Sequence, residues 1–184
     1  LFLAAYWLYI DGVNTIIKMA VDYGLSLGFD SSKLVAALLL TQFVAFPAAL
    51  AFGWLGRRIG ARRGIFLALL VYVAVTCFAY FIASARDFYI LAVAVGLVQG
   101  GIQSLSRSYF GRLVPEGKSS EFFGFYNMMG KASAIVGPIL VGVTAAVTHD
   151  QRLSILSILL LFISGGWMLM IAARSARADA ALVR

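Results

Sequence analysis

Residues 88–109, FYILAVAVGLVQGGIQSLSRSY, join an apolar run to a segment with two glutamines, three serines and an arginine. The apolar run is typical of a membrane-spanning helix, which needs about 20 mostly apolar residues. On a helical wheel the polar and small residues fill one arc, and the opposite arc is apolar except for Tyr109. The stretch therefore predicts a helix with one face toward lipid and one polar face at membrane depth.

The composition of the whole chain agrees with a membrane protein. Of its 184 residues 62% are hydrophobic and 12% charged, whereas soluble domains are about 45–50% apolar and about 25% charged. The formal charge is +7, but the basic residues lie in short clusters between apolar runs. That pattern favours membrane topology over nucleic-acid binding. The single Cys77 excludes an internal disulfide, and the single His149 argues against a histidine metal site.

Six apolar segments are long enough to be spans, and short polar links join them. They cover residues 1–20, 34–55, 65–83, 88–109, 122–147 and 153–173. We predict an all-α fold with one six-span domain over residues 1–184. The third and sixth spans are the most apolar, which suggests two inverted three-helix repeats, a known transporter plan. The chain has no initiator methionine and opens inside an apolar run, so we expect a piece of a longer protein.

Basic residues are unevenly shared between the two sets of links. One side carries Arg57, Arg58, Arg62, Arg63, Arg107, Arg112, Lys118, Arg174, Arg177 and Arg184. The other side carries Lys33, Arg86 and Arg152. Because basic residues are retained in the cytoplasm, we predict that both ends of the chain face the cytoplasm.

The first span carries Asp11, Asn14 and Lys18, which share one helical face. A charge at the bilayer centre costs about 2.5–3.5 kcal/mol, so such residues face the bundle interior or a wet cavity. A substrate or proton site is one interpretation of this face. A structural ion pair is the alternative, as is a Lys18 that extends to the membrane surface.

Three helices bring polar groups to similar depths. At 1.5 Å per residue, Lys131 in the fifth span lies about 14 Å from the cytoplasmic end, and Gln99 about 16 Å from the other end. Asn127 shares the face of Lys131, and Gln103 shares that of Gln99. We predict a hydrated central cavity lined by these residues with Asp11 and Asn14. The small residues and Pro138 of the fifth span are better explained by close packing or a kink.

Enzyme motifs are absent from the sequence. It contains no Gly-x-Ser-x-Gly motif, phosphate-binding loop, Cys/His cluster or paired carboxylates. We therefore predict no enzymatic activity and no cofactor or metal.

The link GWLGRRIGARR resembles the loop motif of the major facilitator superfamily. The matching residues are Gly53, Leu55, Arg58, Gly60, Arg62 and Arg63, whereas Arg57 stands where that superfamily has an aspartate. The segments YWLYIDGVNTI and GLVQGGIQSLSRSYFGRLVPEGKSSEFFGFYNMMGKASAIVGPIL resemble the vacuole-effluxer-like branch, whose fungal members are associated with amino-acid export. The resemblance covers the whole chain and implies the carboxy-terminal six helices of a twelve-helix transporter in a bacterial cell membrane.

The resemblance implies secondary transport by alternating access, with H⁺ or another ion as coupling partner. A small solute, an amino acid among the candidates, would bind in the cavity, and the arginine-rich loop with Arg107 would gate the cytoplasmic side. The partners would be membrane lipid and the missing amino-terminal half, or a second copy of this chain. The alternative hypothesis is a membrane scaffold or truncated remnant that does not transport.

Overall fold

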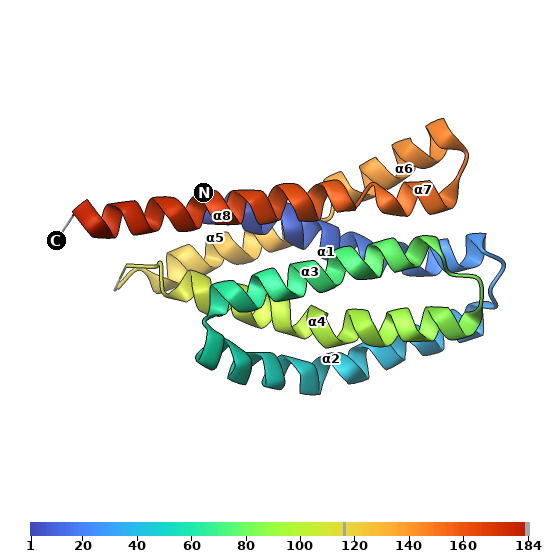
Figure 1. Cartoon of the computed structure of the whole chain (residues 1–184), viewed down its shortest axis with the longest axis horizontal. Coiled ribbons are helices and arrows are strands. Elements are labelled where there is room, and N and C mark those ends of the chain that lie inside the picture. Colours follow the sequence, from blue (N-terminus) through green and yellow to red (C-terminus); the bar gives the residue numbers. More distant parts are fainter. Residues whose placement is uncertain (116, 183–184) are drawn as a thin grey trace.

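The structure, a computed structural model, describes residues 1–115 and 117–182, with side chains through Arg174 (Figure 1). Within those residues every regular element is a helix, which confirms the all-α prediction. The helices are α1 (Phe2–Ser26), α2 (Ser31–Ile59), α3 (Ala61–Tyr80), α4 (Ala85–Gly111), α5 (Ser119–Ala132), α6 (Val136–Thr148), α7 (Gln151–Leu156) and α8 (Leu159–Leu182). The side chain of Arg177 and all of Arg184, both used in the topology prediction, lie outside the described part.

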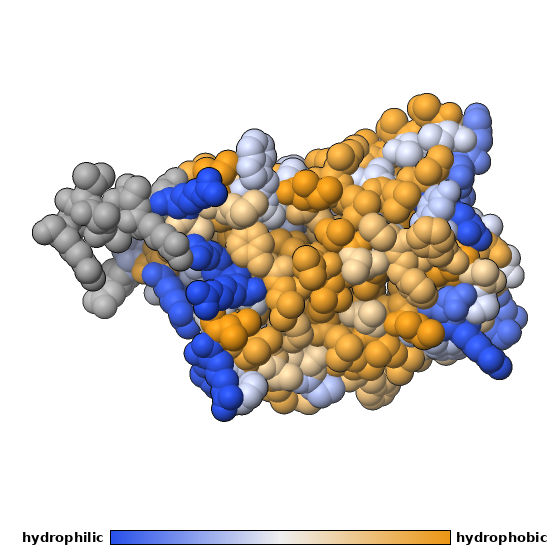
Figure 2. All heavy atoms as spheres, in the orientation of Figure 1, coloured by the Kyte–Doolittle hydropathy of each residue, from blue (hydrophilic) through white to orange (hydrophobic). Residues whose placement is uncertain are grey.

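Five segments are long and apolar enough to cross a membrane: α2, α3, α4, α5 with α6, and α7 with α8. The 25 residues of α1 are sufficient in length. Its intramembrane polar residues, such as Asp11 and Lys18, lower its hydropathy, and α1 is not among the five. Figure 2 shows hydrophobic side chains across the middle of the molecule and hydrophilic residues gathered at both ends. The chain is an integral membrane protein.

Polar side chains fix where several helices begin. The Ser84 hydroxyl accepts from the Asp87 N–H, and the Asp87 carboxylate accepts from the Ser84 N–H, a capping box for α4. The carboxylate of Asp30 caps α2 by accepting from the Ser32 hydroxyl and backbone N–H. These bonds favour the charged form and lower the pKa of Asp30.

The link between the second and third spans is almost wholly helical, unlike the loop expected from the sequence. α2 continues through Ile59 and α3 begins at Ala61, so the turn is made at Gly60, whose φ is +87°. Only glycine adopts this conformation without strain. Arg57 and Arg58 therefore lie in the last turn of α2, where positive charge is favoured by the helix dipole.

Glycines allow the close packing of α4 against α2. A Cβ atom on Gly96 would lie 2.7 Å from the carbonyl oxygen of Thr41, and one on Gly100 would lie 2.5 Å from that of Ala45. This is a small-xxx-small contact of the kind that brings membrane helices together. α2 and α3 both pack along α4, and α1 packs along α8 (Figure 1). The arrangement brings α1, α2, α4 and α5 around a shared space.

Candidate functional site

A cavity of about 560 Å³ opens between α1, α2, α4 and α5. Ligand sites have volumes of about 300–1,000 Å³, so the space is sufficient for a small solute. Its lining consists of Tyr6, Ile10, Asn14, Ala49, Gly100, Gln103, Ser104, Arg107, Tyr126, Asn127, Gly130 and Lys131. None of the lining residues belongs to α3, α6, α7 or α8.

Four of the seven predicted pathway residues meet in this cavity. Asn14, Gln103, Asn127 and Lys131 come from three helices and line one space. Arg107, predicted for the cytoplasmic gate, lies in the same wall. Their spacing of three or four residues within each helix explains the common direction of their side chains.

Three other predicted pathway residues lie elsewhere. Lys18 is exposed and is not part of the cavity wall. Gln99 is half-buried beside the α2–α4 contact, and its Oε1 atom is buried without a hydrogen-bond partner. Asp11 is fully buried and lies outside the lining.

The cavity wall is cationic. Arg107 and Lys131 line it, and its described lining residues include no aspartate or glutamate. Within the described residues, neither of these two side chains forms an ion pair. The Arg107 guanidinium lies 5.4 Å from the centre of the Phe123 ring, a cation–π contact that holds it at the rim.

Two tyrosines of the cavity wall were not predicted from the sequence. The rings of Tyr6 and Tyr126 stack with their centres 4.3 Å apart, joining α1 to α5. Tyr6, Ile10 and Asn14 repeat every four residues, so they form the stripe of α1 that faces the cavity. This i, i+4 spacing was the signal available in the sequence.

The fifth predicted span is broken in its middle. α5 ends at Ala132 and α6 begins at Val136, and Ala134 between them has a φ of +86°. Pro138 explains the position of the break, because it cannot donate a hydrogen bond to the carbonyl of Ala134 and its ring would clash there. In the first turn of α6, where no intrahelical donor is needed, proline is tolerated. The break exposes the amino terminus of α6 inside the membrane.

Asp11 binds that helix terminus. Its carboxylate accepts hydrogen bonds from the backbone N–H groups of Val136 and Gly137, both at 3.0 Å. The Thr15 hydroxyl donates a further bond at 3.2 Å. A buried carboxylate is thus compensated by two otherwise unpaired N–H groups and by the positive end of the helix dipole. In this structure Asp11 is bound to the α6 backbone and not to Lys131.

A second contact holds the other side of the break. The Asn14 amide donates to the Ser133 hydroxyl at 2.9 Å, and that hydroxyl donates to the carbonyl of Gly130 at 2.6 Å. Asn14 therefore lines the cavity and also binds the residue that follows α5. Through Asp11 and Asn14, one segment of α1 holds both halves of the broken span.

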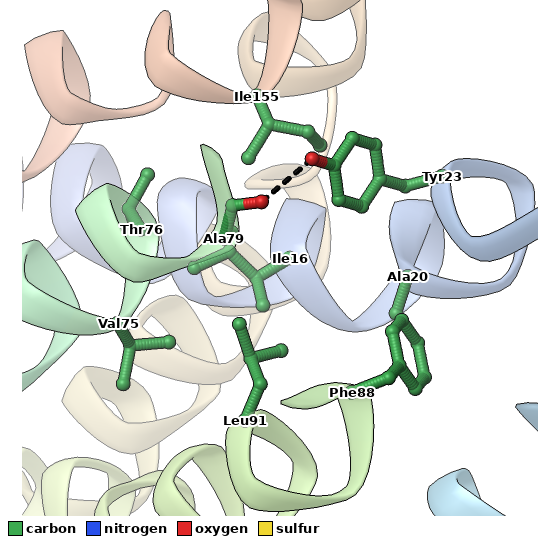
Figure 3. A pocket seen from close by; sticks show the side chains of 9 residues that line it. All are labelled: Ile16, Ala20, Tyr23, Val75, Thr76, Ala79, Phe88, Leu91 and Ile155. Atoms are coloured by element: carbon green, nitrogen blue, oxygen red, sulfur yellow. Dashed lines mark hydrogen bonds between the residues drawn. The ribbon is translucent and has the colours of Figure 1, made fainter. Parts of the chain in front are cut away.

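A different crevice, between α1, α3, α4 and α7, has the properties of packing rather than of a site (Figure 3). Its volume is about 30 Å³, room for about one or two waters, and its lining is almost wholly apolar. The Tyr23 hydroxyl in its wall donates to the carbonyl of Ala79 at 2.7 Å, as Figure 3 shows. This polar group is already used to join α1 to α3.

The residues of the predicted loop motif divide between two helices. Arg57 and Arg58 are exposed, and Arg58 stacks 4.0 Å over the Trp54 ring. Arg62 and Arg63 lie in the first turn of α3, and Gly53 faces open space. Within residues 1–115 and 117–174, whose side chains the structure describes, no group of His, Cys, Asp and Glu side chains could hold a metal ion.

The model of a protein family described as "Vacuole effluxer Atg22 like" matches residues 1–181. The chain belongs to this family. The family predicted from the sequence resemblance is thereby confirmed.

Relatives of this Atg22-like chain include bacterial and fungal proteins. It is 46% identical over 165 residues to the "Uncharacterized MFS-type transporter YxiO" of Bacillus subtilis, covering 90% of this chain and 39% of that protein. It is 44% identical over 68 residues to "Autophagy-related protein 22" of Eremothecium gossypii, covering 37% of this chain and 13% of that protein. With "Autophagy-related protein 22-2" of Aspergillus clavatus it shares 28% identity over 158 residues, 77% of this chain and 26% of the relative. The chain thus spans well under half the length of these relatives.

Proposed function

We propose that this chain forms the carboxy-terminal half of a secondary active transporter, which moves small solutes by alternating access. The observation that carries the proposal is the polar cavity enclosed by α1, α2, α4 and α5. In a bundle packed without a cavity, directing two cations and several amides toward one space at membrane depth would be energetically costly. The name of the Bacillus subtilis relative, an MFS-type transporter, supports the same function.

In this proposal the cavity wall binds the solute. Asn14, Gln103 and Asn127 supply hydrogen bonds, and Arg107 and Lys131 attract negatively charged groups. Amino acids, the substrate class that the resemblance implies, suit this wall because each carries a carboxylate. The facing wall would come from an amino-terminal half or from a second copy of this chain. No catalytic role is assigned to any residue.

Asp11 would act through the broken span. While ionised, it holds the first turn of α6 by two backbone hydrogen bonds. Protonation would remove the negative charge and weaken that hold, so that α6 could reorient at residues 133–135. A proton is therefore the coupling ion in this proposal.

Uptake of labelled amino acids into vesicles that contain the intact protein tests the transport role. Lys131→Met should lower uptake at least tenfold, because it removes a cation from the cavity. Lys18→Met is the matched control: it removes an exposed lysine outside the cavity and should change uptake less than twofold. Equal uptake by both variants would contradict the assignment of the cavity.

Cysteine labelling tests the cavity without a known substrate. In a Cys77→Ser background, a water-soluble maleimide should label Asn127→Cys in membrane vesicles. Leu70→Cys, on the outer face of α3 and 68% exposed, should remain unlabelled because lipid covers it. A protein that moves no solute and leaves Asn127→Cys unlabelled would favour the scaffold hypothesis.

A further inference from the structure

A second charged pocket lies between α3 and α8, away from the solute cavity. Its volume is about 200 Å³, and it is lined by Arg62, Arg63, Phe66, Met170, Ala173 and Arg174. Because α3 and α8 contribute nothing to the solute cavity, this pocket opens on a different face of the bundle. Along the same two helices Leu70 is 68% exposed and Trp167 63% exposed, as expected of a surface in contact with lipid.

The charge of this pocket is unbalanced. Three guanidinium groups line it, and among its described lining residues there is no carboxylate. Within the described residues, none of the three arginines forms an ion pair. Arg62 and Arg63 also lie in the first turn of α3, which has no side-chain cap and carries the positive end of the helix dipole. An anion bound here would relieve the mutual repulsion of three like charges.

The rest of the lining is apolar, which distinguishes this pocket from a site for a free anion. Phe66, Met170 and Ala173 continue from the arginines along α3 and α8. In Figure 2 hydrophilic residues gather at the end of the molecule where α3 begins, next to the hydrophobic middle. A ligand with a phosphate at one end and a hydrocarbon chain at the other matches both parts.

We propose that Arg62, Arg63 and Arg174 bind the phosphate headgroup of an anionic phospholipid. Guanidinium groups bind phosphate by paired, charge-assisted hydrogen bonds. The acyl chains lie beside Phe66 and Met170 and continue into the bilayer. Since the arginines belong to two helices, the bound lipid joins the start of α3 to α8 at this end of the bundle.

Native mass spectrometry of the intact, delipidated protein in detergent tests this site. Phosphatidylglycerol, phosphatidylcholine and inorganic phosphate are titrated separately, and bound molecules are counted. The test variant replaces the three arginines of the pocket by glutamine: Arg62→Gln, Arg63→Gln and Arg174→Gln. The control removes the same charge outside the pocket: Arg57→Gln, Arg58→Gln and Arg112→Gln.

We expect the wild type to bind phosphatidylglycerol in preference to phosphatidylcholine and inorganic phosphate. Each arginine near a membrane surface raises the affinity for anionic lipid roughly fivefold. The affinity of the test variant for phosphatidylglycerol should therefore fall about a hundredfold, and that of the control less than about fivefold. Equal losses in the two variants would overturn the proposal in favour of unspecific attraction. Inorganic phosphate bound as tightly as the lipid would equally refute it. If the triple variant fails to fold, Arg174→Gln alone should lose about fivefold, and an unchanged affinity would contradict the site.

Discussion

Replacing Asp11 by alanine should strongly destabilise the protein. The substitution removes the acceptor of the Val136 and Gly137 N–H groups, which lie 3.0 Å from the carboxylate. Both donors then stay inside the membrane without a partner, because Asp11 is fully buried and no water replaces it.

The size of the effect follows from these two bonds. A buried donor left without a partner costs about 1–3 kcal/mol, and bonds to a charged acceptor are at the upper end of the range. Asp11→Ala should therefore lower the free energy of unfolding by about 3–6 kcal/mol. Asp11→Asn keeps one acceptor oxygen but turns an NH₂ group toward the other N–H donor. The free energy of unfolding should therefore fall by about 2–3 kcal/mol.

Unfolding by sodium dodecyl sulfate in mixed micelles, followed by tryptophan fluorescence, measures these differences. Asp22→Ala is the matched control, since Asp22 is an exposed aspartate of the same helix, and it should cost less than about 0.5 kcal/mol. Hydrogen exchange supplies a local readout: the amides of Val136 and Gly137 should lose protection in Asp11→Ala. If Asp11→Ala stays within 1 kcal/mol of the wild type with those amides still protected, the reasoning on the broken span is refuted.

Three further changes test side-chain contacts between helices, with the same unfolding assay. Gly137→Ala places a Cβ against the Thr15 hydroxyl and the Asp11 carboxylate and should lower the free energy of unfolding by about 1–3 kcal/mol. The control is Gly142→Ala, on the same helix with open space around it, which should leave stability unchanged. Equal effects of the two changes would contradict the contact. The buried hydroxyls of Tyr9 and Ser106 lie 2.7 Å apart, within hydrogen-bond distance. A double-mutant cycle of Tyr9→Phe with Ser106→Ala should therefore give a coupling energy of about 0.5–1.5 kcal/mol. Additive effects of the two substitutions would argue against the bond. The Arg152 guanidinium donates to the carbonyls of Tyr80 and Ile82 at the end of α3, each at 3.0 Å. Arg152→Gln should therefore lower the free energy of unfolding by about 1–3 kcal/mol. A change below about 0.5 kcal/mol would exclude a role of Arg152 in holding α7.

The polar face of α1 shows what sequence patterns can predict about a membrane helix. The spacing of Asp11, Asn14 and Lys18 correctly indicates polar residues directed away from lipid for the first two. The stripe that faces the cavity is Tyr6, Ile10 and Asn14, so Asn14 is the one member of the expected stripe that lines the cavity. A helical wheel gives the spread of a polar face but not the rotation of the helix, which packing against α8 and α4 decides.

The break in the fifth span could be suspected but not placed from the sequence. Pro138 and its neighbouring small residues indicate a kink, yet a proline in a membrane helix is often tolerated without a break. Here the carboxylate of Asp11, more than a hundred residues earlier in the chain, satisfies the freed N–H groups. Such a contact depends on tertiary structure, so local patterns contain no information about it.

The two cations of the cavity bear on how the cavity can close. Arg107 and Lys131 are exposed to the open cavity, so water hydrates them although they lie in a membrane-spanning bundle. Excluding that water without supplying a negative charge would cost about 2.5–3.5 kcal/mol for a cation at the bilayer centre, such as Lys131 at its predicted depth. In the proposed transport cycle, a closed state would therefore need an anionic group, from the solute or from the facing wall. If the solute supplies that group, the proposed cycle predicts that closure follows solute binding.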